Sequence, residues 1–276
     1  MSLMKRSMLI VFACLLATAT LHADDAVLAY WDFQQVEGRV VTEKKGQFNG
    51  LLFNGPLPYV IGQDNNGPQT VIGYKSDSLA MMFNSSEQGD TKADYMSVGN
   101  ADQLKLGQND WTMTGWIKCA GFTADQTNHM FITTNAKTKG NGFSVIVLRQ
   151  GHRSHGHLNV ALKGPDGKEA VYLNSRTRID DNQWHWFAIR VQNRMLSLWL
   201  DGNKQGQRDM GDIVTADPSA KLYFATRDGL RCPFNGALDD LLIYSKAMTA
   251  RIDTKGDLLG GQLYENWKNG VLPDQP

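Results

Sequence analysis

The stretch that decides the fold is residues 184–201, which read WHWFAIRVQNRMLSLWLD. Two runs of alternating side chains, 184–191 and 196–200, flank the pair Asn193-Arg194, and this arrangement predicts a β-hairpin. Because side chains alternate between the two faces of a strand, the continuous apolar face predicts the core side of the hairpin. Antiparallel pairing across the turn places Val191 opposite Leu196, Ile189 opposite Leu198 and Phe187 opposite Leu200.

Short β-type runs continue outward from the hairpin in both directions along the chain. Turn residues separate them, and the chain holds 27 glycines and 8 prolines, which suits a fold with many turns. Strands without intervening helices predict an all-β antiparallel β-sandwich or barrel. The predicted strands are residues 27–33, 79–83, 95–98, 111–119, 130–134, 143–148, 158–162, 170–173, 184–191, 196–200, 221–225 and 237–244.

The second face of the hairpin is unusually aromatic for a face turned to solvent. It carries Trp184, Trp186 and Trp199, with Arg190 and Asp201 beside them. Sugar rings stack on aromatic faces while nearby polar groups bind their hydroxyls, so these five residues are the predicted ligand-binding set. The alternative is that the tryptophans are structural and lie beneath loops, because buried Trp more often serves packing.

Composition excludes several classes of protein. Hydrophobic residues make up 42% of the 276, enough for a packed core, so global disorder is excluded. The 28 basic residues balance the 28 acidic ones, and without a basic excess we predict no nucleic-acid partner. The one long apolar run, near the N-terminus, is too short for a permanent bilayer helix, so we predict no membrane span.

That N-terminal run has the pattern of a secretory signal peptide. Lys5 and Arg6 precede the apolar stretch 8–17, MLIVFACLLA, and small residues follow it. The candidate cleavage sites lie between Ala19 and Ala23. We therefore expect an exported protein, secreted or periplasmic.

The rest of the chain shows no internal repeat and no low-complexity linker. We predict a signal peptide over residues 1–23, a single domain over 24–250 and a C-terminal extension over 251–276. A short helix is expected in that extension, near residues 262–268.

The order of motifs resembles the laminin-G-like, concanavalin A-like lectin/glucanase domains. The resemblance spans residues 27–249, and it implies a jelly roll of two antiparallel sheets packed face to face. Since this superfamily includes lectins, adhesion modules and glycosidases, the fold does not settle the function. The motifs are YWDF at 30–33, GQFNG at 46–50, LAMMF at 79–83, DYMSV at 94–98, WTMTGWIK at 111–118, WHWFA at 184–188, LWLDG at 198–202 and FNGALDD at 234–240.

A glycosidase needs two carboxyl groups close together, one of them as the general acid. The sequence has no run of alternating carboxylates on one strand, and its glutamates are scattered. Asp239 and Asp240 are adjacent, so a regular strand would point them to opposite faces. Catalysis is therefore the alternative, with carboxylates assembled from distant segments.

The resemblance also implies a structural calcium ion near the two ends of the domain. Strand alternation places Asp239 on the face of Leu241 and Ile243, and a buried carboxylate must be paired, hydrogen-bonded or metal-bound. Oxygens near Asp32 and Asn49 would supply further ligands. The alternative is an Asp239 that only accepts hydrogen bonds from backbone N–H groups.

Two further residue groups bear on possible sites. Cys119 ends one predicted strand and Cys232 precedes another, so a disulfide forms if these strands are neighbours, with two separate thiols as the alternative. His152, His155 and His157 form the sequence GHRSHGH, which could hold a metal but is better interpreted as a polar loop.

The sequence thus predicts an exported, non-catalytic module that binds a glycan or another cell-surface ligand. A polysaccharide-acting glycosidase or lyase is the second interpretation. A structural or adhesion domain that binds protein is the third.

Overall fold

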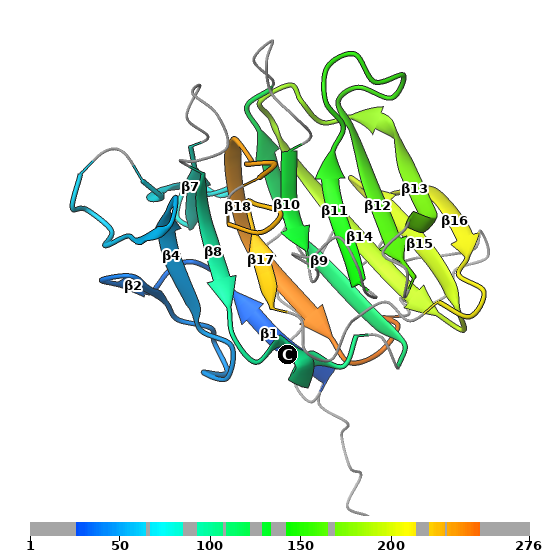
Figure 1. Ribbon diagram of the computed structural model, residues 1–276, viewed down its shortest axis with the longest axis horizontal. Coiled ribbons are helices and arrows are strands. Elements are labelled where there is room, and N and C mark those ends of the chain that lie inside the picture. Colours follow the sequence, from blue (N-terminus) through cyan, green and yellow to red (C-terminus); the bar gives the residue numbers. More distant parts are fainter. Residues whose placement is uncertain are drawn as a thin grey trace, which may run out of the picture.

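The structure is a computed structural model that describes residues 26–64, 67–84, 93–106, 109–121, 129–133, 142–164, 169–213, 221–229 and 231–248. These residues form two antiparallel β-sheets packed face to face, as Figure 1 shows. The predicted all-β sandwich is confirmed. The predicted signal peptide and the predicted helix near 262–268 lie outside the described residues.

The first sheet, called sheet A, has eight strands, and β18 at its centre pairs with three of them. One side of β18 pairs with β9; on the other side, its first half pairs with β7 and its second half with β1. The order is β16 (Asn203–Asp209), β15 (Met195–Leu200), β14 (Trp184–Gln192), β9 (Trp111–Cys119), β18 (Gly236–Tyr244), β7 (Leu79–Phe83) and β6 (Gln69–Ile72), with β1 (Val27–Trp31) beside β18.

The second sheet, called sheet B, has ten strands and lies in front of sheet A in Figure 1. Its order is β13 (Glu169–Arg178), β12 (His157–Lys163), β11 (Gly142–Val147), β10 (His129–Thr133), β17 (Leu222–Phe224), β8 (Asp94–Val98), β4 (Gly50–Asn54), β3 (Val40–Val41) and β2 (Val36–Glu37), with β5 (Leu57–Pro58) paired to β4. A single 3-10 turn, η3 (Ala101–Leu104), follows β8.

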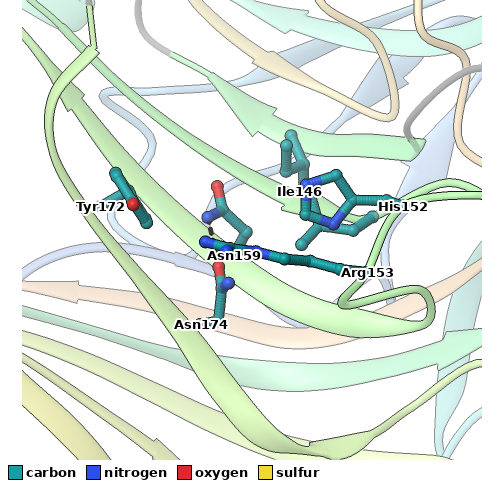
Figure 2. Close-up of a pocket in the computed structure, with 7 residues that line it drawn as sticks. Ile146, His152, Arg153, Asn159, Tyr172 and Asn174 are labelled. Atoms are coloured by element: carbon teal, nitrogen blue, oxygen red, sulfur yellow. Dashed lines mark hydrogen bonds between the residues drawn. The ribbon is translucent and has the colours of Figure 1, made fainter.

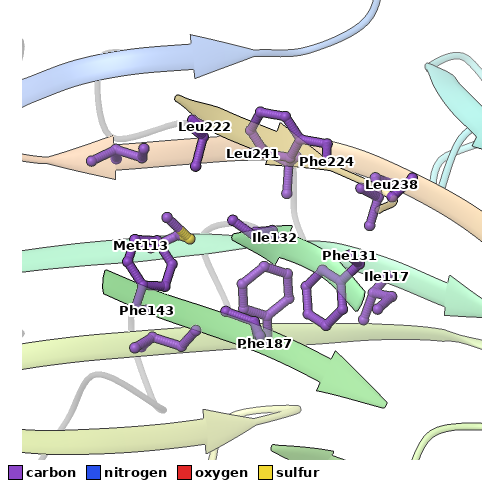
Figure 3. Close-up of a cluster of buried hydrophobic side chains, with 14 of the residues drawn as sticks. Met113, Ile117, Phe131, Ile132, Phe143, Phe187, Leu222, Phe224, Leu238 and Leu241 are labelled. Atoms are coloured by element: carbon purple, nitrogen blue, oxygen red, sulfur yellow. The ribbon is translucent and has the colours of Figure 1, made fainter. Parts of the chain in front are cut away.

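The main core fills the space between the inner faces of the two sheets. Apolar side chains from β9, β14 and β18 meet those from β10, β11 and β17, as Figure 3 shows. Phe131 and Phe187 come from opposite sheets and pack edge to face, with ring centroids 5.5 Å apart. Each fully buried aromatic side chain of this size stabilises the fold by about 1.5–3 kcal/mol.

The hairpin of β14 and β15 has the predicted register. Phe187 pairs with Leu200, Ile189 with Leu198 and Val191 with Leu196, and all six side chains belong to the main core. Asn193 and Arg194 both have left-handed φ values, 48° and 66°, as a two-residue turn of the type favoured in hairpins requires.

A bulge in β18 corrects two predictions about Asp239 and Asp240. The register of β18 with β9 shifts between Asp239 and Leu242, and Asp240 has a left-handed φ of 45°. Leu238 and Leu241 both enter the main core, so the two aspartates between them lie on the outer side of sheet A. Asp239 therefore does not share a face with Leu241 and Ile243, and the aspartates do not point to opposite faces.

Among the described residues, no helix has both the length and the apolar character needed to cross a bilayer.

Candidate functional site

The candidate site is a pocket on the outer face of sheet B. It has a volume of about 230 Å³ and lies over β11, β12 and β13, beside the loop 148–156 that joins β11 to β12. Figure 2 shows Tyr172 on one side, Ile146 and His152 on the other, and Arg153 between them. The lining residues are Ile146, Leu148, His152, Arg153, Asn159, Tyr172 and Asn174.

Strand alternation explains which side chains reach this pocket. On β12, Leu158, Val160 and Leu162 enter the main core, so the intervening Asn159 points outward. On β13, Val171 packs against the core and Leu173 enters it, so Tyr172 points outward, where 49% of its surface is exposed. The pocket therefore rests on a rigid sheet.

A pair of amides lies at the base of the pocket. Asn159 Nδ2 donates to Asn174 Oδ1 at 2.6 Å, and Asn174 Nδ2 donates to Ser154 Oγ in the loop at 3.4 Å. The amide of Asn159 thus keeps its oxygen as a hydrogen-bond acceptor on the pocket side of the pair (Figure 2).

The loop that carries His152 and Arg153 is held by its own backbone hydrogen bonds. Gly156 N donates to Leu148 O at 2.9 Å, and His155 N donates to His152 O at 3.0 Å. Ser154 N also donates to His152 Nδ1 at 3.0 Å. These bonds fix the position of the loop before any ligand arrives.

Asp180 anchors the loop 148–156 through a contact with His155. Its carboxylate contacts His155 Nε2 at 3.1 Å and accepts two hydrogen bonds from Arg178, and those bonds lower the pKa of Asp180. Gly156 has a φ of +76° and lies directly against the Asp180 carboxylate, so a larger residue there would displace it.

The three histidines of GHRSHGH point to three different partners. His152 accepts from Ser154, His155 contacts Asp180, and His157 Nδ1 lies 2.8 Å from Ser175 O. No group of three or more potential metal-ligating His, Cys, Asp or Glu residues occurs in the part of the chain that the structure describes. The contacts fit the interpretation of this segment as a polar loop.

The aromatic set predicted from the hairpin is not exposed, which corrects that expectation. Trp186 and Trp199 each have 0% of their surface exposed, and Trp184 is half-buried. With Trp116 and Tyr30 they belong to a second apolar cluster on the outer face of sheet A, called here the outer cluster. A ring without an exposed face cannot stack on a sugar, so the pocket on sheet B is the better candidate.

Arg190 and Asp201 act within the protein instead of facing a ligand. The Arg190 guanidinium lies over the Trp199 ring, 4.9 Å from its centroid, and the residue is buried. Asp201 accepts a hydrogen bond from Trp186 N at 2.9 Å and contacts His185 Nδ1 at 2.7 Å. Both side chains therefore stabilise the hairpin.

The residues predicted to ligate calcium all have protein partners. Asp239 accepts hydrogen bonds from Tyr74 N, Ser78 Oγ and Asp240 N, and its burial and the neighbouring Asp240 charge raise its pKa to about 8. Asp32 pairs with Lys44 at 2.8 Å, and Asn49 Oδ1 accepts from Glu43 N at 2.9 Å. Calcium binding stays a prediction.

The predicted disulfide between Cys119 and Cys232 is not formed. Cys119 lies in the main core, whereas Cys232 packs against Ile146 and Leu148 on the outer face of sheet B. The strands β9 and β18 are antiparallel neighbours, as the prediction required, and Gly236 pairs with Cys119. Cys232 lies before β18, however, and its side chain packs on the outer face of sheet B, away from the core that holds Cys119.

Sequence reasoning missed the pocket because its residues come from three strands and a loop. A usable signal was present in the polar residues that alternate with the core positions of β12 and β13. This signal was weaker than the cluster of tryptophans in the hairpin, which pointed to sheet A.

Comparison with known proteins shows the family. The sequence profile described as the concanavalin A-like lectin/glucanases superfamily matches residues 90–251. A search of curated protein sequences returned no significant match.

Several solved structures share the fold at low sequence identity. The binding domain of Paraclostridial Mosquitocidal Protein 1 is 18% identical with a TM-score of 0.59, over 82% of this chain and 50% of that one. The binding domain of botulinum neurotoxin serotype C1 is 11% identical with a TM-score of 0.59, over 90% and 53% respectively. This chain thus spans about half the length of the toxin binding domains it matches.

A third structure matches over nearly its whole length. It is domain 4 of AbnA, an extracellular GH43 arabinanase from Geobacillus stearothermophilus, in complex with arabinotriose. It is 14% identical with a TM-score of 0.55, over 81% of this chain and 94% of that one. These likenesses show the fold, and the profile covers more than half of the chain: the protein belongs to the concanavalin A-like lectin/glucanases superfamily.

Proposed function

We propose that this protein is a carbohydrate-binding module and that the pocket over β11, β12 and β13 is its binding site. The observation that carries the proposal is the combination of groups in one pre-formed pocket. Tyr172 offers an exposed ring, Asn159 an amide oxygen and Arg153 a charged donor. Sugars are bound by such a ring together with a few fixed polar groups.

The structural neighbours support a carbohydrate ligand. The arabinanase domain was solved with arabinotriose, and botulinum neurotoxin type C depends on two ganglioside molecules for cell entry. Another toxin binding domain, of which this chain covers 52%, was solved in complex with rat synaptotagmin II, a protein. The small pocket on this chain suits a sugar better than a protein surface.

The lining of the pocket favours binding over hydrolysis. None of the seven lining residues is Asp or Glu. Glycoside hydrolysis by the usual route needs a pair of carboxyl groups on either side of the scissile bond. The signal-like N-terminal sequence further supports export, where a module of this kind would meet polysaccharides or cell-surface glycans.

The test is a glycan-array screen of the protein, followed by calorimetric titration of the best oligosaccharide. Tyr172→Ala and Asn159→Ala should each weaken binding roughly five- to tenfold, because each removes a contact of about 1 kcal/mol. Ile72→Ala, which truncates a 69% exposed side chain on β6, is the matched control and should bind normally. Unchanged affinity in both pocket variants would place the site elsewhere, and the absence of any glycan ligand would refute the function.

A further inference from the structure

The pocket on sheet B has a charge pattern that the proposed function alone does not explain. Arg153 supplies a full positive charge, His152 lies beside it, and none of the described residues that line the pocket is Asp or Glu. A site for neutral sugars commonly uses carboxylates as acceptors for hydroxyl groups. Among the lining residues that the structure describes, the only full charge is the Arg153 cation.

Three other exposed arginines of the molecule pair with nearby carboxylates. Arg178 pairs with Asp180, Arg194 with Asp212 and Arg231 with Asp228. Arg153 makes no ion pair with any residue in the described part of the chain, and its guanidinium extends toward the Asn159–Asn174 pair inside the pocket (Figure 2). Asp180, which anchors the loop of Arg153, is already engaged by Arg178 and His155.

We propose that the pocket selects an acidic saccharide and that Arg153 binds its carboxylate or sulfate group. This inference rests on the proposed carbohydrate-binding function and names the class of ligand. The planar guanidinium presents two parallel N–H donors, which match the paired oxygens of either anion. Lysine, as a compact point charge, would match them less well.

The rest of the pocket orients the sugar that carries the anion. The Asn159 amide oxygen accepts from a ring hydroxyl, while the exposed face of Tyr172 packs against the ring. Ile146 and Leu148 form an apolar wall and, because the loop is held by Asp180, Arg153 needs little reordering on binding. The site thus combines one charged contact with a stacking surface, a hydrogen-bond acceptor and an apolar wall.

The experiment uses three matched pairs of oligosaccharides in calorimetric titrations. The pairs are oligogalacturonate and its methyl ester, sialyllactose and lactose, and a sulfated galactan oligosaccharide and its desulfated form. We expect the acidic member of at least one pair to bind at least tenfold more tightly at low salt. Which pair responds distinguishes carboxylate from sulfate, and roughly 0.5 M NaCl should weaken only the acidic member.

Variants separate the inference from the function it rests on. Arg153→Gln should remove the preference within the responding pair, so that the affinities for its acidic and neutral members lie within twofold of each other. Arg153→Lys should recover only part of the preference, and Arg208→Gln, at an exposed arginine of β16, should change nothing. Equal binding of acidic and neutral members, or a preference that survives Arg153→Gln, overturns the inference but leaves carbohydrate binding intact. If no member of any pair binds, carbohydrate binding at this pocket fails as well.

Discussion

His185 illustrates how a single side chain makes the stability of this protein depend on pH. It bridges Asp201 Oδ2 at 2.7 Å and Asp181 Oδ1 at 3.1 Å, which ties the start of β14 to the turn after β15. Burial opposes protonation of the imidazole, but the two carboxylates outweigh it and raise the pKa of His185. The folded protein therefore holds this proton more tightly than the unfolded chain does.

A raised pKa of this kind stabilises the fold fully below the unfolded value of about 6.5, and the contribution is lost as the pH rises through the folded value. We expect His185→Gln to lower the Tm more at about pH 5.5 than at about pH 8.5. Thermal unfolding of both proteins across this range measures the difference. A Tm difference that stays constant with pH would show that His185 contributes packing alone.

The turn residue Arg194 gives a second prediction at this scale. Its φ of 66° is a conformation that costs a non-glycine residue roughly 1 kcal/mol, and glycine adopts it freely. Its partner Asp212 is almost fully exposed, so their ion pair contributes little. In urea titrations, Arg194→Gly should therefore be more stable than Arg194→Ala by about 0.5–1 kcal/mol. The reverse order would mean that the turn does not carry this strain.

At the scale of an element, the bulge in β18 depends on the hydrogen bonds that Asp239 accepts. Asp239→Ala would remove the acceptor of the buried Asp240 N–H and of the part-buried Tyr74 N–H, and one of the two acceptors of Ser78 Oγ. We expect a loss of roughly 2–4 kcal/mol in the free energy of unfolding. Asp102→Ala, at an exposed residue of η3, should cost almost nothing. Comparable losses in both variants would contradict the special role of the bulge.

The calcium prediction can be tested on the wild-type protein and on Asp239→Ala. A metal bound only by the folded state raises the Tm at saturating concentration, and a chelator reverses the effect. The resemblance predicts such a rise in the wild type and its absence in Asp239→Ala. A wild-type Tm that responds neither to calcium nor to chelator would leave Asp239 with hydrogen bonding as its only role.

The sequence allowed the hairpin of β14 and β15 to be predicted down to its register, because pairing across the Asn193-Arg194 turn aligns the six aliphatic and phenyl side chains of one face. The same reasoning failed at Asp239 because a bulge inserts a residue that alternation cannot anticipate. It also failed for Trp186 and Trp199, since alternation tells which side chains share a face but does not tell what covers that face. The pocket depends on how three strands and a loop meet, which is a property of tertiary structure.

At the scale of the whole molecule, the depth of each cysteine in the sandwich determines how readily its thiol reacts. Cys119 is fully buried, and burial raises its pKa to about 12, whereas Cys232 is partly exposed. For the chain from residue 24, we expect a thiol reagent to label Cys232 in the native protein and both cysteines after denaturation without reductant. Cys232→Ser should abolish native labelling. Denatured protein that takes up no label would instead prove a disulfide.

The placement of the tryptophans also determines how the protein can be observed in solution. All six described tryptophans, Trp31, Trp111, Trp116, Trp184, Trp186 and Trp199, belong to strands of sheet A, and none lines the pocket. Their fluorescence should shift strongly to the red when the sandwich unfolds, because these mostly buried indoles then meet water. A ligand bound on sheet B, by contrast, should leave that emission almost unchanged. Intrinsic fluorescence is thus a good probe of folding here, and binding must be followed by heat or by a label near Tyr172.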